Sequence, residues 1–174
     1  MTHLFIVSVV CPDRPGLIAA LTERLFDLGA NLGDASFSVL GRGAEFTAVC
    51  EMPASASATE VGDALRALPE TAGGEVSVRA FAFAPEQDDS GRTTHLIEVS
   101  GGDRPGLVAR LAEVFQQYEA NIVRLNSTRS ARGGRASYVI SIAAHIPAAC
   151  GESCLNTVAN TAGELGLTCR IDPV

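Results

Sequence analysis

The sequence lacks the features of several common classes of protein. It contains no tryptophan, aromatic residues make up 5% of it, and its formal net charge is −7 with a pI of about 4.9. A protein that binds nucleic acid directly usually carries a basic stripe, and no such stripe is present. An aromatic and basic platform of the RRM type is also missing. We therefore expect no direct nucleic-acid binding.

Long apolar runs and a secretory signal are lacking as well. The longest apolar run, Leu4 to Cys11, is too short to span a bilayer. No basic residue precedes this run, and Asp13 and Arg14 follow it at once, so we expect no signal peptide. Hydrophobic residues make up 47% of the chain, which is enough for a sizeable core. A cytoplasmic protein without membrane contact is expected.

The cysteines and histidines form no recognisable metal motif. The five cysteines are Cys11, Cys50, Cys150, Cys154 and Cys169. Cys150 and Cys154 are spaced to share one face of a helix, so a metal pair is conceivable, but partly buried thiols in a reducing compartment are the favoured interpretation. The three histidines, His3, His95 and His145, fall at strand ends without the spacing of a zinc site. No metal and no cofactor are expected.

The most informative feature that the chain does contain is an internal repeat. Residues 11–35 read CPDRPGLIAALTERLFDLGANLGDA, and residues 101–125 read GGDRPGLVARLAEVFQQYEANIVRL. Ten of these 25 positions are identical without a gap, at a separation of 90 residues. Asp-Arg-Pro-Gly-Leu and Ala-Asn both return, which indicates two copies of one structural unit.

Hydropathy patterning predicts strand–helix–strand–strand–helix–strand in the first copy. Strands are expected at residues 3–10, 31–40, 45–52 and 75–83. Pro15 suits the first position of a helix, with Asp13 or Arg14 at its cap and Gly29 as a left-handed end. Gly41-Arg42-Gly43 predicts a hairpin turn, and Gly73-Gly74 is expected to end a second helix that begins near Val61.

The same order is predicted for the second copy. Strands are expected at residues 95–100, 121–129, 135–144 and 167–171, with a turn at Gly133-Gly134 and helices after Pro105 and around residues 155–165. Residues 84–92 are polar and turn-rich, which predicts a linker between domains at residues 1–83 and 93–174. The fold class is therefore α+β: two ferredoxin-like units, each an antiparallel four-stranded sheet with two helices on one face.

The duplicated residues suggest chemistry at two places in each copy. Gly16 and Gly106 lie in tight strand-to-helix turns that a ligand could approach closely, and a helix start attracts a carboxylate. Asn31 and Asn121 offer a donor and an acceptor, so the two places together could bind an amino acid. We expect both places to meet at one end of the sheet. The alternative is that these residues are ordinary caps and turns.

A strand followed by Asp-Arg-Pro-Gly-Leu, then a helix that ends in Gly-Ala-Asn-Leu, resembles the ACT domain. The resemblance covers residues 3–83 and 93–172, and a pair of ACT units without an attached enzyme resembles the glycine cleavage system transcriptional repressor family. The segment ANLGDASFSVLGRGAEFT, residues 30–47, is similar in character to that family's first unit. The resemblance implies a regulator that contacts a DNA-binding protein without touching DNA, which fits the acidic charge.

The ACT resemblance also implies a set of ligand-binding residues. In ACT domains an effector typically lies between two units, against the first strand-to-helix loop and the second strand. The matching positions are Asp13, Arg14, Gly16, Leu17, Asn31 and Asp34 in the first copy, and Asp103, Arg104, Gly106, Leu107, Asn121 and Arg124 in the second. Asp34 aligns with Arg124, so we expect the two sites to differ chemically.

Enzymatic activity is not expected. The chain has no acylphosphatase loop, no Gly-x-Ser-x-Gly, no Walker loop and no Cys/His/Asp cluster. The ACT unit ahead of formyltetrahydrofolate deformylases begins in a similar way, but we expect no catalytic domain to follow here. A metallochaperone would need two thiols at the first loop, where only Cys11 lies.

The expected function is that of a non-enzymatic regulator, and a homodimer is favoured. The regulator is expected to bind an amino acid such as glycine or serine between ACT units and to modulate a transcriptional regulator by protein contact. The alternatives are a protein-interaction module without a ligand and a regulatory subunit of an amino-acid metabolic enzyme.

Overall fold

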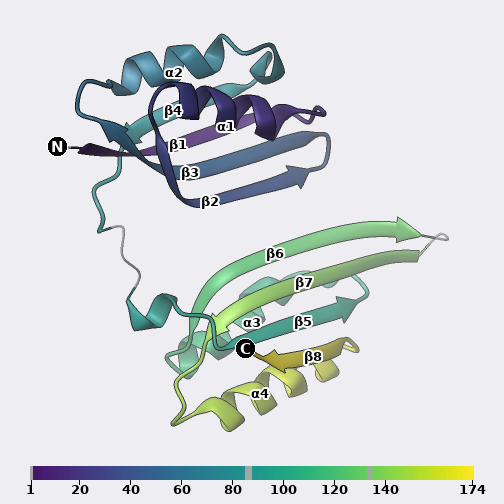
Figure 1. Ribbon diagram of the computed structural model, residues 1–174. Helices are drawn as coiled ribbons and strands as arrows, with labels where there is room; N and C mark the ends of the chain where they lie inside the picture. The colour runs from purple at the N-terminus through teal and green to yellow at the C-terminus, as the bar shows by residue number, and fades with distance from the viewer. Residues whose placement is uncertain (1, 85–87, 133–134) are drawn as a thin grey trace. The chain divides into compact units, whose positions relative to one another are not determined.

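The computed structural model describes residues 2–84, 88–132 and 135–174 (Figure 1). Contacts within the chain group it into two compact units, Met1–Pro85 and Glu86–Val174. We call them the first unit and the second unit. Each unit has its own hydrophobic core, so each is described by itself.

The first unit is one antiparallel sheet covered by two helices on one face (Figure 1). Its elements are β1 (Thr2–Pro12), α1 (Leu17–Asp27), β2 (Asn31–Leu40), β3 (Gly43–Pro53), α2 (Ala58–Arg66), the 3₁₀ turn η1 (Pro69–Thr71) and β4 (Glu75–Ala80). The strand order is β2-β3-β1-β4, and every neighbouring pair is antiparallel. The strands β1 and β2 therefore run in the same direction, on either side of β3.

Alternation of buried and less buried residues along β1 and β3 produces the core of the first unit. On β1, Val7 and Val9 point toward the helices and are buried, while Ser8 between them faces the other side of the sheet. Leu21 and Leu25 of α1 lie one helical turn apart and are fully buried against this face. Each such side chain contributes about 2 kcal/mol through the apolar area that it removes from water.

The second unit repeats this architecture. Its elements are the 3₁₀ turn η2 (Asp89–Gly91), β5 (His95–Gly101), α3 (Leu107–Gln117), β6 (Asn121–Arg132), β7 (Arg135–His145), α4 (Gly151–Glu164) and β8 (Thr168–Pro173). The strand order β6-β7-β5-β8 is the same, and again every neighbouring pair is antiparallel. The expected α+β class, with two ferredoxin-like units in tandem, is thereby confirmed. The predicted turn at Gly133-Gly134 lies outside the described residues.

The starts of α1 and α3 differ from the prediction. Each helix begins two residues after the proline, at Leu17 and Leu107, and is preceded by a glycine in the left-handed conformation. Because a left-handed residue cannot continue a right-handed helix, the proline lies in the preceding turn and is not the first helical residue. Asp13 and Arg14 do not cap α1, since no side chain forms a capping hydrogen bond there. Gly29 does end the helix in the left-handed region, at φ 80°, as predicted.

Several other element boundaries differ from the sequence prediction. The helix α2 ends at Arg66, well before Gly73-Gly74, because Pro69 opens the short turn η1 and cannot donate a helical hydrogen bond. The fourth strand ends at Ala80 and does not continue to residue 83. The last strand begins at Thr168, one residue later than predicted.

The segment that precedes β5 packs on the second unit. Thr94 Oγ1 donates to the carbonyl of Ala144 at 3.2 Å and accepts from the amide of Ile146 at 2.9 Å. His145 Nδ1 donates to the carbonyl of Arg92 at 3.0 Å. The second half of the polar segment at residues 84–92 is thus held by the end of β7.

No helix in the described part of the chain has the length and hydropathy needed to cross a membrane.

Candidate functional site

Both copies of Asp-Arg-Pro-Gly form the same backbone turn between a strand and a helix. We call residues 13–16 the first elbow and residues 103–106 the second elbow. The glycines that end them, Gly16 and Gly106, have φ angles of 87° and 78°. A Cβ placed on either glycine would touch nothing within 4 Å. The glycine is therefore required by the left-handed backbone and not by a lack of space.

Each elbow leaves a helix start without a side-chain cap. The first helical hydrogen bonds join the amide of Ala20 to the carbonyl of Gly16, at 2.9 Å, and the amide of Arg110 to the carbonyl of Gly106, at 3.0 Å. The amides of Leu17 and Leu107 donate to the carbonyls of Arg14 and Arg104, each at 3.3 Å. The next two amides of each helix have no acceptor within the helix and lie at its end, where the helix dipole adds partial positive charge. Such an end suits a carboxylate.

The arginine of the first elbow is bound to its own unit. The guanidinium of Arg14 donates to the carbonyl of Pro69 at 2.6 Å and to that of Ala72 at 3.0 Å, with a longer contact of 3.5 Å to Glu70. These carbonyls come from η1 and the residue after it, and that of Pro69 also accepts from the amide of Ala72 at 3.2 Å. Arg14 therefore fastens the first elbow to the connection between α2 and β4.

The arginine of the second elbow has different surroundings. The connection from α4 to β8 consists of residues 165–167 only and contains no 3₁₀ turn, so it offers no equivalent carbonyls. Arg104 is exposed, and within the described ranges its side chain forms no hydrogen bond or ion pair. Asp103 instead pairs with Arg129 at 3.0 Å, and the Arg129 guanidinium lies 5.6 Å from the centre of the Tyr138 ring. The second elbow thus carries a free cation that the first elbow does not.

Two of the predicted site residues are part of the core. Leu17 and Leu107 directly follow the elbow glycines, and each is 2% exposed. Their side chains anchor the first turn of α1 and α3 from inside the unit. They hold the elbow in place but do not present a surface to a ligand.

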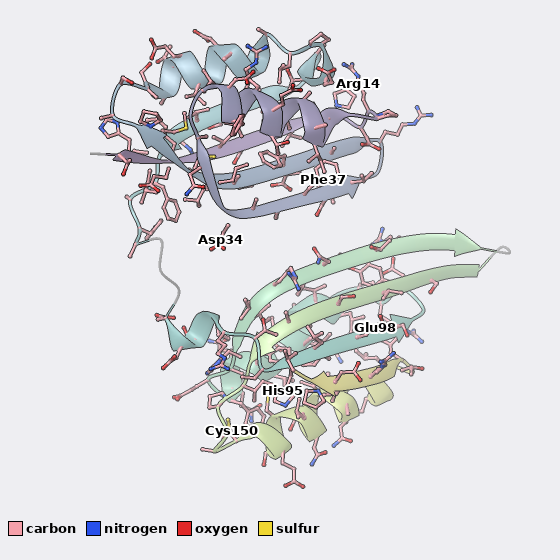
Figure 2. The ribbon with its side chains drawn as sticks, viewed as in Figure 1. Arg14, Asp34, Phe37, His95, Glu98 and Cys150 are labelled. Carbon is pink, nitrogen blue, oxygen red and sulfur yellow. The ribbon has the colours of Figure 1, made fainter. Side chains whose placement is uncertain are left out.

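The asparagine and the elbow of one unit lie at opposite ends of its sheet, which corrects the expectation that they meet. Asn31 pairs with Glu51 of β3, at the end where β1 begins, whereas the end of β1 pairs with Gly43 beside the elbow. The nine residue steps of β2 span about 30 Å. Figure 2 shows Arg14 and Asp34 at these two ends of the first unit. The same register places Asn121 opposite His145, far from the second elbow.

The second-strand residues also differ between the units. The amide Nδ2 of Asn121 donates to the carbonyl of Ser90 at 2.8 Å, which ties the start of β6 to the segment before β5. Asn31 is exposed, and the described residues provide no hydrogen-bond partner for its side chain. The registers of β2 and β6 shift at residues 32–35 and 122–124, so Asp34 lies within an irregularity at a sheet edge and Arg124 directly follows one. Bulges at such places re-aim side chains.

Two surface hollows lie near the predicted residues. A hollow of about 460 Å³ lies beside the end of β1 and is lined by residues that include Pro12, Arg42, Gly73 and Glu75. None of the predicted site residues lines this hollow. A second hollow, of about 270 Å³, lies on the sheet of the second unit and includes one of them, Arg124. Its other lining residues were not predicted, although a glutamate at the outward position of the alternating segment HLIEVS is a signal that could have indicated Glu98.

The thiols have the character of buried apolar groups. Burial raises the pKa of Cys50 to about 11, and burial together with the neighbouring Cys150 raises the pKa of Cys154 to about 11. These two thiols are therefore protonated and unreactive at neutral pH. In the part of the chain that the structure describes, no three His, Cys, Asp or Glu side chains gather as a metal site would require.

The fold and the two glycine elbows define a class of protein. The ACT domain family matches residues 3–79 and, a second time, residues 95–149, which together exceed half of the chain. The chain belongs to the ACT domain family and carries two copies of the domain in tandem.

A particular relative can then be named. The chain is 26% identical over 148 residues to the glycine cleavage system transcriptional repressor of Escherichia coli K12, and the match covers 84% of this chain and 76% of that protein. It is also 30% identical over 130 residues to a bifunctional uridylyltransferase/uridylyl-removing enzyme of Caulobacter vibrioides, but only 14% of that enzyme is covered. This protein is accordingly an ACT domain protein related to a transcriptional repressor.

Solved structures share the fold over the full length. A crystal structure of an unknown protein from Galdieria sulphuraria matches with a TM-score of 0.76 at 20% identity, covering 100% of this chain and 99% of that one. A crystal structure described as a candidate glycine cleavage system transcriptional repressor matches with a TM-score of 0.69 at 16% identity, covering 100% and 98%. At these identities the likeness concerns the fold.

Proposed function

We propose that this protein is a non-enzymatic regulator that binds a small amino acid, glycine or serine, in a seam between two ACT units. The observation that carries the proposal is the pair of uncapped helix starts behind Gly16 and Gly106. Two copies of one left-handed turn, each with amides that point outward, suit a ligand with a carboxylate.

Edge strands explain how a seam would complete the site. The strands β2 and β6 are edge strands with backbone groups that are free to pair. Antiparallel pairing of two such edges places the start of one strand beside the end of the other. The asparagine of one ACT unit would then lie near the elbow of another, although the two are about 30 Å apart within a unit. A homodimer supplies such edges, which is why we favour a dimer.

The second elbow is the better candidate for the carboxylate. Arg104 is exposed and free of partners among the described residues, while Arg14 is held by the carbonyls of Pro69 and Ala72. The side-chain oxygen of Asn31 would accept from the ammonium group of the ligand. Ligand binding in the seam would favour one arrangement of the ACT units over another and so change the affinity for a partner.

The partner that we propose is a transcriptional regulator. The relative in Escherichia coli is named as a transcriptional repressor, while the net charge of −7 on this chain disfavours contact with DNA phosphates. A protein that controls transcription by binding a transcriptional regulator would fit both the name of the relative and the acidic charge of this chain. An immobilised tagged chain should retain a DNA-binding regulator from its own cells, in an amount that changes when glycine is added. Retention that is indifferent to amino acids would indicate an interaction module without a ligand.

The ligand site is tested by calorimetric titration of the full chain with glycine and with serine. Arg104→Gln should weaken binding about tenfold, because a hydrogen bond to a charged group contributes roughly 1.5–3 kcal/mol. The matched control is Arg110→Gln, an exposed arginine one helical turn from the elbow glycine, whose replacement changes the net charge equally. The proposal fails if neither amino acid binds, or if both variants bind as tightly as the wild-type chain.

A further inference from the structure

The helix-free face of the second sheet contains the hollow of about 270 Å³. The helices α3 and α4 cover the other face, as the burial of Val99 and Ile140 shows. Glu98 on β5 lies on the helix-free face (Figure 2). The hollow is slightly smaller than the usual ligand pocket of about 300–1,000 Å³, so it fits only a small metabolite.

Small residues on β7 form the floor of the hollow. Ser141 lies directly between Glu98 of β5 and Asn126 of β6 in one cross-strand row. Ala143 lies between Leu96 and Arg124 in the next row. The strands on either side of β7 are about 10 Å apart, twice the spacing of neighbouring strands. Long side chains on both sides therefore rise around a floor of short ones.

The walls of the hollow carry one unpaired charge of each sign. Arg170 Nε and Asp172 Oδ2 are 2.9 Å apart, so these two charges largely neutralise each other. Glu98 and Arg124 also line the hollow, and among the described residues neither side chain forms a hydrogen bond or an ion pair. An acceptor for a cation and a donor for a carboxylate thus lie on opposite sides of Ser141 and Ala143.

The first unit lacks this arrangement at the equivalent positions. Ser8 takes the place of Glu98, and its hydroxyl lies 3.4 Å from that of Thr47, which takes the place of Ser141. Val49 takes the place of Ala143 and provides a larger side chain there. The charged hollow is therefore a feature of the second unit and not a consequence of the repeat.

We propose that this hollow is a second ligand site, for a small zwitterion that places its cationic group at Glu98 and its carboxylate at Arg124 and Asn126 Nδ2. A zwitterion satisfies both unpaired charges at once, whereas a simple amine or a simple carboxylate satisfies one. The site is distinct from the elbows, because it lies on the sheet face and uses no residue of the two turns.

The test follows the backbone amide resonances of β7 by NMR while the full chain is titrated with glycine, β-alanine and γ-aminobutyrate, which separate the two charges by increasing distances. At least one zwitterion should shift the amides of Ser141 and Ala143, while methylamine and acetate, each with one of the charges, should have effects about tenfold weaker. If none of the three zwitterions shifts the β7 amides, the proposal is overturned.

Substitutions separate this site from the elbows. Ala143→Val, which installs the side chain of Val49, should abolish the shifts, and Glu98→Gln should weaken binding about tenfold. Glu113→Gln, an exposed glutamate on α3, is the charge-matched control and should have no effect. Arg104→Gln should leave the β7 shifts intact even where it reduces binding at the second elbow. Undiminished shifts in both Ala143→Val and Glu98→Gln would contradict the proposal without affecting that for the elbows.

Discussion

Arg14 and Arg104 occupy the same place in two copies of Asp-Arg-Pro-Gly, yet their side chains have different surroundings. Arg14 binds the carbonyls of Pro69 and Ala72, while Arg104 is exposed and binds nothing in the described parts of the chain. The difference arises more than 50 residues away, because only the first unit has a 3₁₀ turn before its last strand. Both copies of Asp-Arg-Pro-Gly therefore form the same backbone turn, which depends on glycine. The arginine side chain, in contrast, has different contacts in each copy.

The helix-free faces of the two sheets differ in the same way. The backbone register is equivalent, but the first unit has hydroxyl groups at Ser8 and Thr47 where the second has Glu98 and Ser141. Residues that point into the core are constrained by packing, whereas residues that point away from the helices can diverge. Chemical differences between the units are thus concentrated at the elbows and on these faces.

The largest effect is expected from matched truncations in the two cores. Leu21 and Leu111 are equivalent, and both are 0% exposed. Replacing either with alanine should lower the free energy of unfolding of its own unit by about 3 kcal/mol, because a cavity remains. Both tyrosines, Tyr118 and Tyr138, belong to the second unit, so tyrosine fluorescence follows that unit during urea denaturation while circular dichroism follows both.

Leu111→Ala should shift the tyrosine transition to lower urea concentration, and Leu21→Ala should leave it in place. An equal shift of that transition by Leu21→Ala would show that the units unfold together, and the comparison of two independent cores would then be wrong.

The next largest effect concerns one buried thiol in each unit. Because burial raises the pKa of Cys50 and of Cys154 from the usual 9.0 to about 11, the folded state holds these protons more tightly than the unfolded state. The free energy of unfolding should be insensitive to these thiols below pH 9 and should fall as pH rises from 9 to 11, by on the order of 2 kcal/mol for each thiol.

Urea denaturation followed by circular dichroism at pH 8, 9.5 and 10.5 measures this loss. Cys50→Ala and Cys154→Ala lower stability at every pH, but each should make the decline above pH 9 shallower. A decline as steep as that of the wild-type chain in both variants would show that other groups cause it.

A smaller and equal effect is expected at the two elbow glycines. Gly16→Ala and Gly106→Ala should each lower the free energy of unfolding by about 1–2 kcal/mol, because a Cβ disfavours the left-handed conformation even where space is open. Gly102→Ala is the control, since that glycine also has open space but no left-handed φ. If the two substitutions lower the free energy of unfolding by different amounts in denaturation experiments, the turns at Gly16 and Gly106 are not equivalent.

The smallest effect should distinguish the two arginines. Arg14→Gln should lower the free energy of unfolding by about 1 kcal/mol through the loss of its bonds to backbone carbonyls. Arg104→Gln should change it by less than about 0.5 kcal/mol, as is usual for an exposed side chain without partners. If Arg14→Gln and Arg104→Gln lower the free energy of unfolding equally in thermal or urea denaturation, the distinction between a structural and a free arginine is wrong.

Burial made most of the fold predictable from the sequence. Phe46, Ala48 and Cys50 alternate with more polar neighbours, and all three are buried on one face of β3. The starts of α1 and α3 were misplaced because two local rules compete there: a proline favours the first helical position, while a glycine favours a left-handed turn. The left-handed turn forms at both positions.

The sites were less predictable because their partners are distant in the sequence. The bonds of Arg14 to residues 69–72 depend on a 3₁₀ turn that no local pattern at residues 13–16 indicates. The separation of Asn31 from the elbow could have been deduced, since a helix that connects two parallel strands returns the chain to the end where the first strand began. The register between strands, which juxtaposes Glu98, Ser141 and Asn126, could not be predicted from periodicity alone.

The central claim is that one free arginine makes the second elbow a ligand site while the first elbow is structural. A crystal structure of the full chain grown with glycine or serine tests this claim most directly. We predict the carboxylate of the amino acid at the start of α3, within hydrogen-bond distance of Arg104, and an empty first elbow with Arg14 still bound to Pro69. An amino acid that binds against Arg14, or that occupies neither elbow, would contradict the account.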